Sequence, residues 1–422
     1  MALKDFTKEI ERCSACSYCK WIPYDHVKSA RFAKNCPSID YFNFNNYSAR
    51  GRYLTAKSIL REEAEITEEV KQIVHSCLTC GSCDIACKIA RYNLEPLEMV
   101  KELKNDLVAK GEFPDEHKVL LENLKKENNI LGKSRKDRGA WAKGLNLKDL
   151  SKEKAEVVFH AGCSYSYDEK LSGTVKTAVQ ILSGAGVDFG IMGDAEMCCG
   201  ARIYSMGHVE EYKRLANANI KLWEKAGVKT IVTACADGYH AFKRLYPQLG
   251  SQFKVMHIVE YIDQLIKEGK LRFTKEVPLR VTYHDPCHLG RLGEPYVEWE
   301  GEETTYREQI VVHTTRKPRY NGIDGIYDEP RNILNSIPGV ELIEMERIRE
   351  CSYCCGAGGG APETYPEYSG WVAGERLEEA ASTGAEVLVT ACPWCKSNFS
   401  GAMGDNSSMD IIDILDLVQK AL

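Results

Sequence analysis

Hydrophobic residues follow two different periods along this chain of 422 residues. Up to about residue 130 they return every three or four positions, the spacing of an amphipathic helix. This predicts helices at 53–75, 97–109 and 115–126. From about residue 155, short apolar runs rich in β-branched residues alternate with helical stretches, a pattern typical of α/β units with parallel strands.

Four apolar runs in this second part predict buried strands, at 157–160, 229–235, 280–287 and 386–392. Helices are predicted between them at 169–183, 208–226, 330–336 and 374–381. Two apolar helices, at 255–267 and 409–421, are expected to close the two halves. The segment 128–154 is polar, basic and interrupted by glycines, so it is either a solvated linker or a stretch docked on the N-terminal part through Trp141.

The second part also contains an internal repeat. The matched stretches are FHAGC and YHDPC, ending at Cys163 and Cys287, then EMCCGAR and SYCCGAG, then TIVTAC and VLVTAC, ending at Cys235 and Cys392. The chain therefore divides into a helical unit at 1–130, a linker at 131–154, and two α/β copies at 155–270 and 279–422. In both copies the cysteines follow strand ends, where open α/β sheets place their ligands.

Composition narrows the function classes. The formal net charge is −6, which gives no reason to expect binding to nucleic acid. No apolar run approaches the 18 residues of a membrane span, and the N-terminus lacks the features of a secretory signal. We expect a cytoplasmic protein whose association with a membrane would come through partner subunits. Its 18 cysteines are then expected to be metal or cluster ligands, because the cytosol keeps thiols reduced.

Eight cysteines of the helical unit have the spacing of a two-cluster ferredoxin, in which each CxxCxxC run is completed by a remote cysteine. The pattern assigns one [4Fe–4S] cubane to Cys13, Cys16, Cys19 and Cys87. It assigns a second cubane to Cys77, Cys80, Cys83 and Cys36. Zinc also binds CxxC pairs, but three cysteines in one CxxCxxC run favour iron–sulfur clusters.

The two copies carry different numbers of thiols. The second copy has five cysteines, with Cys351 as a candidate sixth: Cys287, Cys354, Cys355, Cys392 and Cys395. The first copy has four, with Gly238 where the second has its last cysteine: Cys163, Cys198, Cys199 and Cys235. Five thiolates exceed the need of a cubane, whereas four suit either tetrahedral zinc or one [4Fe–4S] cluster.

This order of cysteines, present twice behind a helical two-cluster ferredoxin, resembles the CCG cysteine-rich domain of heterodisulfide reductases. The D-type subunit, which fuses all three parts, is the nearest in plan, and the resemblance covers essentially the whole chain. Related subunits occur in sulfite-reduction and benzoyl-CoA reductase complexes. The resemblance implies a noncubane [4Fe–4S] cluster, the site of disulfide reduction, at the complete set of Cys287, Cys354, Cys355, Cys392 and Cys395. The first copy departs from the pattern at Gly238.

Other residues near the cysteines have less specific interpretations. His288 is a candidate proton donor, whereas His284 is expected to orient the strand end through a backbone hydrogen bond. The glycines at 356–360 do not form a GxGxxG motif, and we expect them to bring backbone N–H groups close to cluster sulfides. The surplus residues at 294–327 predict a surface loop, or else a lid or a partner contact beside the second set.

Two functions remain open. In the first, the chain is a catalytic subunit that passes electrons through two cubanes to the noncubane cluster, where a disulfide is reduced. In the second, it only transfers electrons between a flavoprotein and a reductase or membrane cytochrome, as in a benzoyl-CoA reductase-type complex. In both, the primary electron donor is a flavoprotein or other redox subunit.

Overall fold

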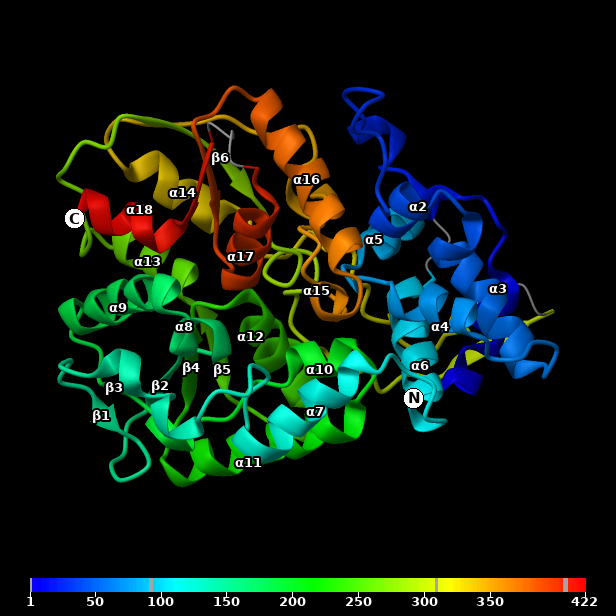
Figure 1. The fold of residues 1–422 in the computed structure, drawn as a ribbon, viewed down its shortest axis with the longest axis horizontal. Coiled ribbons are helices and arrows are strands. Elements are labelled where there is room, and N and C mark those ends of the chain that lie inside the picture. Colours follow the sequence, from blue (N-terminus) through cyan, green and yellow to red (C-terminus); the bar gives the residue numbers. More distant parts are fainter. Residues whose placement is uncertain (1, 91–93, 308–309, 405–408) are drawn as a thin grey trace.

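The computed structural model describes residues 2–90, 94–307, 310–404 and 409–422. Two α/β units lie one above the other in Figure 1, and a helical unit lies beside both. This arrangement confirms the predicted fold class, a helical ferredoxin-like domain followed by two repeated α/β units.

The N-terminal unit is built from short helices. They are α1 (Thr7–Arg12), α2 (Pro37–Phe42), α3 (Ala49–Leu60), α4 (Glu68–His75), α5 (Ser82–Ile89), α6 (Pro96–Ala109) and α7 (Glu116–Glu127). The helices expected at 97–109 and 115–126 are confirmed, but the single helix expected at 53–75 is wrong. Glu62 adopts a left-handed φ of 58°, and the Thr67 side chain caps the next helix by accepting the Val70 N–H. The chain therefore stops and restarts between α3 and α4.

The first α/β unit contains a parallel sheet of order β1-β3-β2-β4-β5. Its strands are β1 (Lys148–Asp149), β2 (Val157–His160), β3 (Phe189–Ile191), β4 (Thr230–Thr233) and β5 (Lys254–His257). Its helices are α8 (Cys163–Tyr167), α9 (Glu169–Gly184), α10 (Ala201–Ser205), α11 (Val209–Lys225), α12 (Ala236–His240) and α13 (Ile258–Lys267).

The second α/β unit repeats this plan with the order β11-β10-β6-β9. Its strands are β6 (Leu279–His284), β9 (Val340–Leu342), β10 (Val387–Thr390) and β11 (Asp410–Asp413). Its helices are α14 (Asp328–Ser336), α15 (Ala361–Thr364), α16 (Pro366–Ser382), α17 (Pro393–Ala402) and α18 (Ile414–Ala421). Because β2, β3, β4 and β5 occupy the places of β6, β9, β10 and β11, the repeat seen in the cysteines is also a repeat of topology.

Both closing helices begin later than expected. The helices predicted at 255–267 and 409–421 each lose their first residues to a strand, β5 or β11. In each case the residue before the helix forms a capping box, His257 with Glu260 and Asp413 with Asp416. The caps separate strand from helix where apolar spacing alone suggested one helix.

The segment 131–154 is docked, but on the first α/β unit rather than on the N-terminal unit. Lys148–Asp149 forms the edge strand β1 beside β3, and the buried Trp141 ring packs edge-on against Phe159. Arg138 is 2% exposed and is paired with Glu196. Helix α7 joins the same core through Leu120 and Leu124.

Candidate functional site

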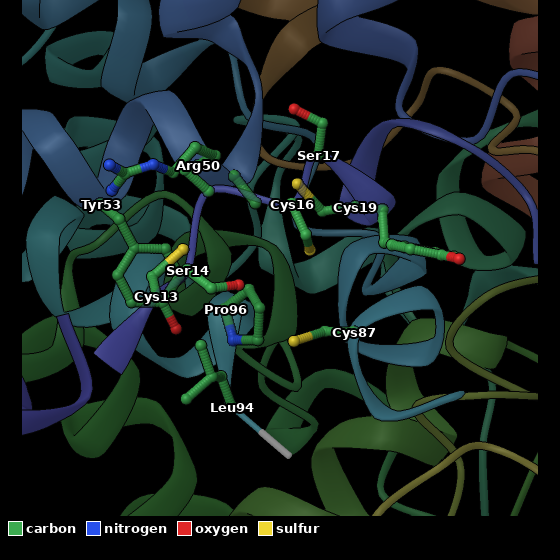
Figure 2. Close-up of a pocket in the computed structure, with 13 residues that line it drawn as sticks. Cys13, Ser14, Cys16, Ser17, Cys19, Arg50, Tyr53, Cys87, Leu94 and Pro96 are labelled. Atoms are coloured by element: carbon green, nitrogen blue, oxygen red, sulfur yellow. The ribbon is translucent and has the colours of Figure 1, made fainter. Parts of the chain in front are cut away.

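The cysteines of the N-terminal unit gather around two hollows. The first hollow, drawn in Figure 2, is lined by Cys13, Cys16, Cys19 and Cys87, together with Arg50 and Tyr53. Three of these cysteines lie on the loop after α1, where Ala15 and Ser17 take left-handed φ values of 59° and 67°. The loop therefore curves around the first hollow, and Cys87 of α5 faces the same hollow from the opposite side.

The second hollow is lined by Cys36, Cys77, Cys80 and Cys83. Cys36 stands at the N-cap of α2, and Pro37 begins that helix. Thr79 and Gly81, both at left-handed φ, curve the loop that carries the other three thiols. The structure therefore brings together the two groups of four that the spacing predicts, and each surrounds a space of the kind a cubane needs.

The five cysteines of the second α/β unit form one continuous group, here called the C-terminal set. Cys287 follows β6, Cys392 follows β10, and Cys395 lies in the first turn of α17. The Sγ atoms of Cys395 and Cys355 are 3.2 Å apart. Hydrogen bonds from Cys354 and Cys395 lower the pKa of the Cys355 thiol. Thiols this close favour a shared metal cluster over separate roles.

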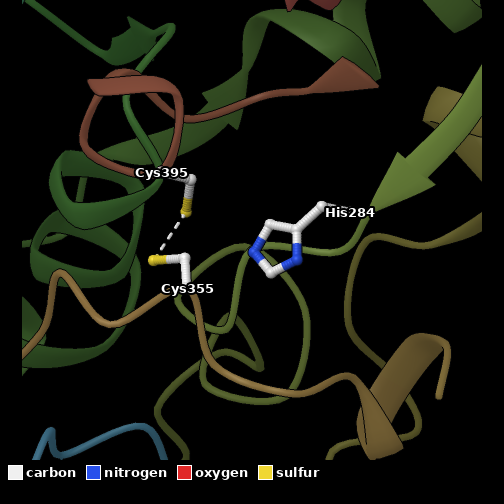
Figure 3. Close-up of side chains that lie close together, drawn as sticks. All are labelled: His284, Cys355 and Cys395. Carbon is white, nitrogen blue, oxygen red and sulfur yellow. Dashed lines mark hydrogen bonds between the residues drawn. The ribbon is translucent and has the colours of Figure 1, made fainter. Parts of the chain in front are cut away.

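His284 borders the C-terminal set rather than only supporting its strand. Its ring nitrogen and the sulfurs of Cys355 and Cys395 lie within 4.8 Å of one another (Figure 3). The partner of Nδ1 is a side chain, since Arg376 Nε donates to it at 3.2 Å, and not the backbone group that the sequence suggested. Burial lowers the pKa of His284, which keeps the ring neutral.

His288 lies between the two copies. Its Nδ1 donates to Asp237 Oδ1 at 2.6 Å, and its ring stacks on His240 with 4.7 Å between ring centroids. Burial opposes the charged form, but Asp237 and the neighbouring thiols outweigh it and raise the pKa of His288 to about 9. Sequence reasoning identified His288 but not its carboxylate partner, which lies 51 residues away in the first copy.

Cys351 is separate from the C-terminal set. Its thiol lies with His26 and Glu350, all three ligand atoms being within 4.8 Å of one another. Burial and the Glu350 carboxylate raise the pKa of this thiol to about 12. Its surroundings differ from those of Cys354, whose neighbours are the thiols of Cys287, Cys355 and Cys80.

The thiols of the first copy also lie close to one another, and one of them contacts a thiol of the second copy. Cys163 contacts Cys198, and the thiol of Cys235 lies beside that of Cys392. Arg138 Nη1 donates to Cys163 Sγ at 3.5 Å, a contact with the docked segment that sequence reasoning did not identify. Among the described residues, the groups of three ligand atoms within 4.8 Å of one another include no first-copy cysteine. The sulfurs are therefore spread wider than one tetrahedral zinc ion requires.

The second hollow adjoins the C-terminal set directly. The thiol of Cys80 is a neighbour of Cys354, and each shifts the pKa of the other. The approach of backbone N–H groups in the glycine run to cluster sulfides stays a prediction. At the centre of the run, a Cβ on Gly358 or Gly359 would stand 2.2 Å from the carbonyl oxygen of Leu78 or Cys77. These glycines let the backbone of the second α/β unit lie against the loop that lines the second hollow.

The insertion at 294–327 contains an antiparallel hairpin, β7 (Glu303–Tyr306) and β8 (Ile310–His313); residues 308 and 309 lie outside the described part. Beyond the hairpin, Tyr320 accepts a hydrogen bond from Lys88 Nζ at its carbonyl, and its ring centroid lies 3.5 Å from the Arg244 guanidinium. The insertion thus contacts both the N-terminal unit and the first copy.

Comparisons with known proteins agree with this arrangement. Residues 9–90 match the family described as "4Fe-4S dicluster domain", and residues 157–243 and 281–400 match "Cysteine-rich domain", CCG. The chain is 31% identical to the D subunit of the dihydromethanophenazine:CoB–CoM heterodisulfide reductase of Methanosarcina mazei, over 98% of this chain and 94% of that protein. The chain belongs to the family of heterodisulfide reductase D subunits. The predicted resemblance is confirmed, and the protein is an iron–sulfur oxidoreductase subunit of this type.

More distant relatives share part of the plan. The EtfAB:quinone oxidoreductase of Syntrophomonas wolfei is 28% identical over 83% of this chain, which spans 47% of that protein. A solved structure of a hypothetical protein from Helicobacter pylori aligns with 99% of this chain and 75% of its own, at a TM-score of 0.50 and 8% identity, and shows fold similarity alone. In the described part of the chain, no helix is long and apolar enough to cross a membrane.

The donors present fit iron–sulfur clusters. Besides the thiols, Arg291 supplies a buried guanidinium whose Nη2 has no hydrogen-bond partner among the described residues. Burial lowers the pKa of Arg291, but the negative charges of Cys80, Cys287 and Cys354 outweigh it and raise that pKa. A positive donor in this position suits the negative charge of cluster sulfur.

Proposed function

We propose that this chain is the disulfide-reducing subunit of a multisubunit redox complex. Its electrons come one at a time from a flavoprotein or other redox subunit and enter at the first hollow. The observation that carries the proposal is the contact of Cys80 with Cys354, which joins the N-terminal unit to the C-terminal set without an intervening layer of protein. Two electrons and two protons convert one disulfide into two thiols.

The residues that would hold the clusters are those already described. The first and second hollows each offer four thiolates for a cubane, and the C-terminal set offers five for a noncubane cluster. When bound, these groups supply one-electron carriers and, in the C-terminal set, iron to which a substrate sulfur can bind. The chain itself orients this site through the Arg376–His284 contact and excludes water by burying Cys354, Cys355, Cys392 and Cys395.

His288 would donate a proton to a departing thiolate. It is 8% exposed, follows Cys287 directly, and is fixed by Asp237 and His240. A proton held in place beside the bond that breaks accelerates its cleavage. The second proton would come from solvent.

The first copy would hold an iron–sulfur cluster rather than zinc. Its four thiols are spaced more widely than a single ion needs, and Cys235 lies beside Cys392 of the C-terminal set. Gly238 removes the fifth ligand, which supports an ordinary [4Fe–4S] cluster at this position.

A second function is favoured by that same glycine. A chain with one incomplete copy could transfer electrons between a flavoprotein and a reductase or membrane cytochrome without reducing a disulfide itself. The likeness to the EtfAB:quinone oxidoreductase of Syntrophomonas wolfei supports this alternative.

Electron paramagnetic resonance of the oxidised protein, with and without added thiol, separates the two functions. The disulfide-reducing function predicts a new signal that depends on thiol, and its loss in Cys395→Ser. Cys351→Ser is the matched control, because this buried thiol lies outside the C-terminal set. A protein that binds iron at all sites but gives no thiol-dependent signal would support electron transfer alone. Metal analysis that finds one zinc ion per chain would contradict the iron–sulfur cluster proposed for the first copy.

A further inference from the structure

Three buried cations surround the second hollow. Arg52 is 1% exposed, Lys104 is 0% exposed and Arg291 is 3% exposed. They come from α3, from α6 and from the loop after β6, so three separate elements each contribute a charge. Placing one charge in a protein interior is costly unless an opposite charge lies close to it.

Within the described residues, none of these cations forms an ion pair with a carboxylate. Arg52 donates to the carbonyls of Ile73 and Tyr47 and to Ser76 Oγ. Lys104 Nζ donates to the Cys77 carbonyl at 2.8 Å and to the Ser205 carbonyl at 3.2 Å.

Arg291 completes the group. Its Nε donates to the Cys80 carbonyl at 2.6 Å, and its Nη1 donates to the carbonyls of Glu350 and Ser352. Carbonyl groups satisfy hydrogen bonds but do not neutralise a charge. The nearest counter-charge for Arg52 and Lys104 is therefore the group held by Cys36, Cys77, Cys80 and Cys83. Arg291 faces the same group through Cys80 and also faces Cys287 and Cys354 of the C-terminal set.

The first hollow has a different electrostatic environment. Its lining cation, Arg50, is partly exposed, so water screens it. Behind Tyr53 lies the half-buried carboxyl group of Glu9, which accepts hydrogen bonds from the Tyr53 hydroxyl and the Glu95 N–H. Asp84 lies between the hollows, near both Cys83 and Cys87, and is paired with Lys88 at 3.8 Å. The unpaired buried positive charge is thus on the side of the second hollow.

From this asymmetry we infer that Arg52, Lys104 and Arg291 make the reduction potential of the second-hollow cluster higher than that of the first. The inference rests on the proposed function, since it requires a cubane in each hollow. Reduction adds one negative charge, and nearby unpaired cations stabilise that charge. An electron that leaves the first cluster would therefore collect at the second, beside Cys354. These three side chains are positioning residues that give electron flow its direction.

Redox titration of the holoprotein, followed by electron paramagnetic resonance, tests this inference. Lys104→Gln keeps a hydrogen-bond donor but removes the charge. We expect the second cluster to become at least tenfold harder to reduce, a fall of about 59 mV for a one-electron couple, with the first cluster unchanged. Cys83→Ser identifies the signal of the second cluster. Lys101→Gln is the matched control, because Lys101 is also buried on α6 but is paired with Glu98.

Arg291→Gln provides a second measurement if Lys104→Gln does not fold, and Arg291→Lys should restore the potential by restoring the charge. A chain with both clusters present but with unchanged potentials in these variants would overturn the inference and leave the proposed function standing. Equal shifts of both clusters, or a shift of the first alone, would also overturn it. Failure of the proposed function is distinguishable, because the parent chain would then give no thiol-dependent signal while the two cubane signals and their potentials could still be measured.

Discussion

The imidazole of His288 donates its Nδ1 hydrogen to Asp237 at 2.6 Å, so a carboxylate of the first α/β unit holds the histidine that follows Cys287 in the second. His240 stacks on the ring of His288, with the two rings inclined by only 8°. The C-terminal set is therefore oriented partly by the copy that lacks a fifth cysteine. The two copies thus meet directly beside Cys287.

Replacing His288 by Gln should lower disulfide turnover by about a hundredfold, because a positioned proton donor contributes about that factor or more. Asp237→Asn should have a smaller effect in the same direction, since it removes the partner that fixes the ring. Turnover with an artificial electron donor measures both, and iron content should stay at the parent value. Asp188→Asn, at an exposed ion pair, is the control. Parent-like turnover in His288→Gln would exclude it as the proton donor.

Replacing Gly358 by Ala should separate the N-terminal unit from the second α/β unit. The new Cβ would stand 2.2 Å from the Leu78 carbonyl oxygen, so the backbone must move. We expect the free energy of unfolding to fall by about 2 kcal/mol or more. We also expect slower reduction of the cluster that the C-terminal set would hold. Gly374→Ala on α16 meets no atom within 4 Å and should be neutral or stabilising. Rapid-mixing reduction and urea unfolding measure the two effects, and equal results for both variants would contradict the close approach.

Replacing Arg138 by Met should destabilise the docked segment 131–154. It would leave Glu196, which is 5% exposed, buried without its partner, at a cost of about 3–5 kcal/mol. Arg135→Met, three residues earlier at an exposed position, should change the free energy of unfolding by less than about 0.5 kcal/mol. Urea unfolding compares the two. Similar stability of both variants would show that the Arg138–Glu196 pair does not hold the segment in place.

Acidification should weaken the contact between α7 and the first α/β unit. His117 Nδ1 and His208 Nε2 are 3.0 Å apart near His75 and Lys104, and burial lowers the pKa of His117 to about 2 and that of His208 to about 4. Since an exposed histidine has a pKa of 6.5, the unfolded chain binds more protons below that pH. Stability should be complete above about pH 6.5 and should fall, by about 1.4 kcal/mol per histidine for each pH unit, as the pH drops toward 4.

Melting temperature as a function of pH measures this dependence. The double variant His117→Gln, His208→Gln should have a shallower slope between pH 6.5 and 4. His313→Gln, in the hairpin of the insertion, should keep the parent slope. A double variant with the parent slope would place the acid sensitivity elsewhere.

Local features of this protein could be predicted from the sequence because they depend on spacing. The CxxCxxC runs indicated which thiols surround each hollow, and the repeat indicated two sheets of one plan. The break at Glu62 and the short strands β5 and β11 could not be predicted from apolar periodicity, since a cap and a left-handed residue decide them. The contacts of Cys80 with Cys354 and of Asp237 with His288 depend on how whole units pack, and no local pattern reports that packing. For the segment that carries Arg138, composition left a solvated linker and a docked stretch equally open.

The glycine at position 238 has a consequence for the disulfide that would bind at the proposed site. A disulfide has two sulfur atoms, and two equal copies would give each of them the same surroundings. Here the fifth cysteine is present in one copy only, and Gly238 of the other copy lies against Thr233 and Phe242. Under the proposed function, the two ends of a disulfide would therefore meet different surroundings. A duplicated protein of this kind would distinguish the two ends of its substrate. Under the proposed function, an asymmetric disulfide would bind in one orientation, and its two thiols would leave in a fixed order.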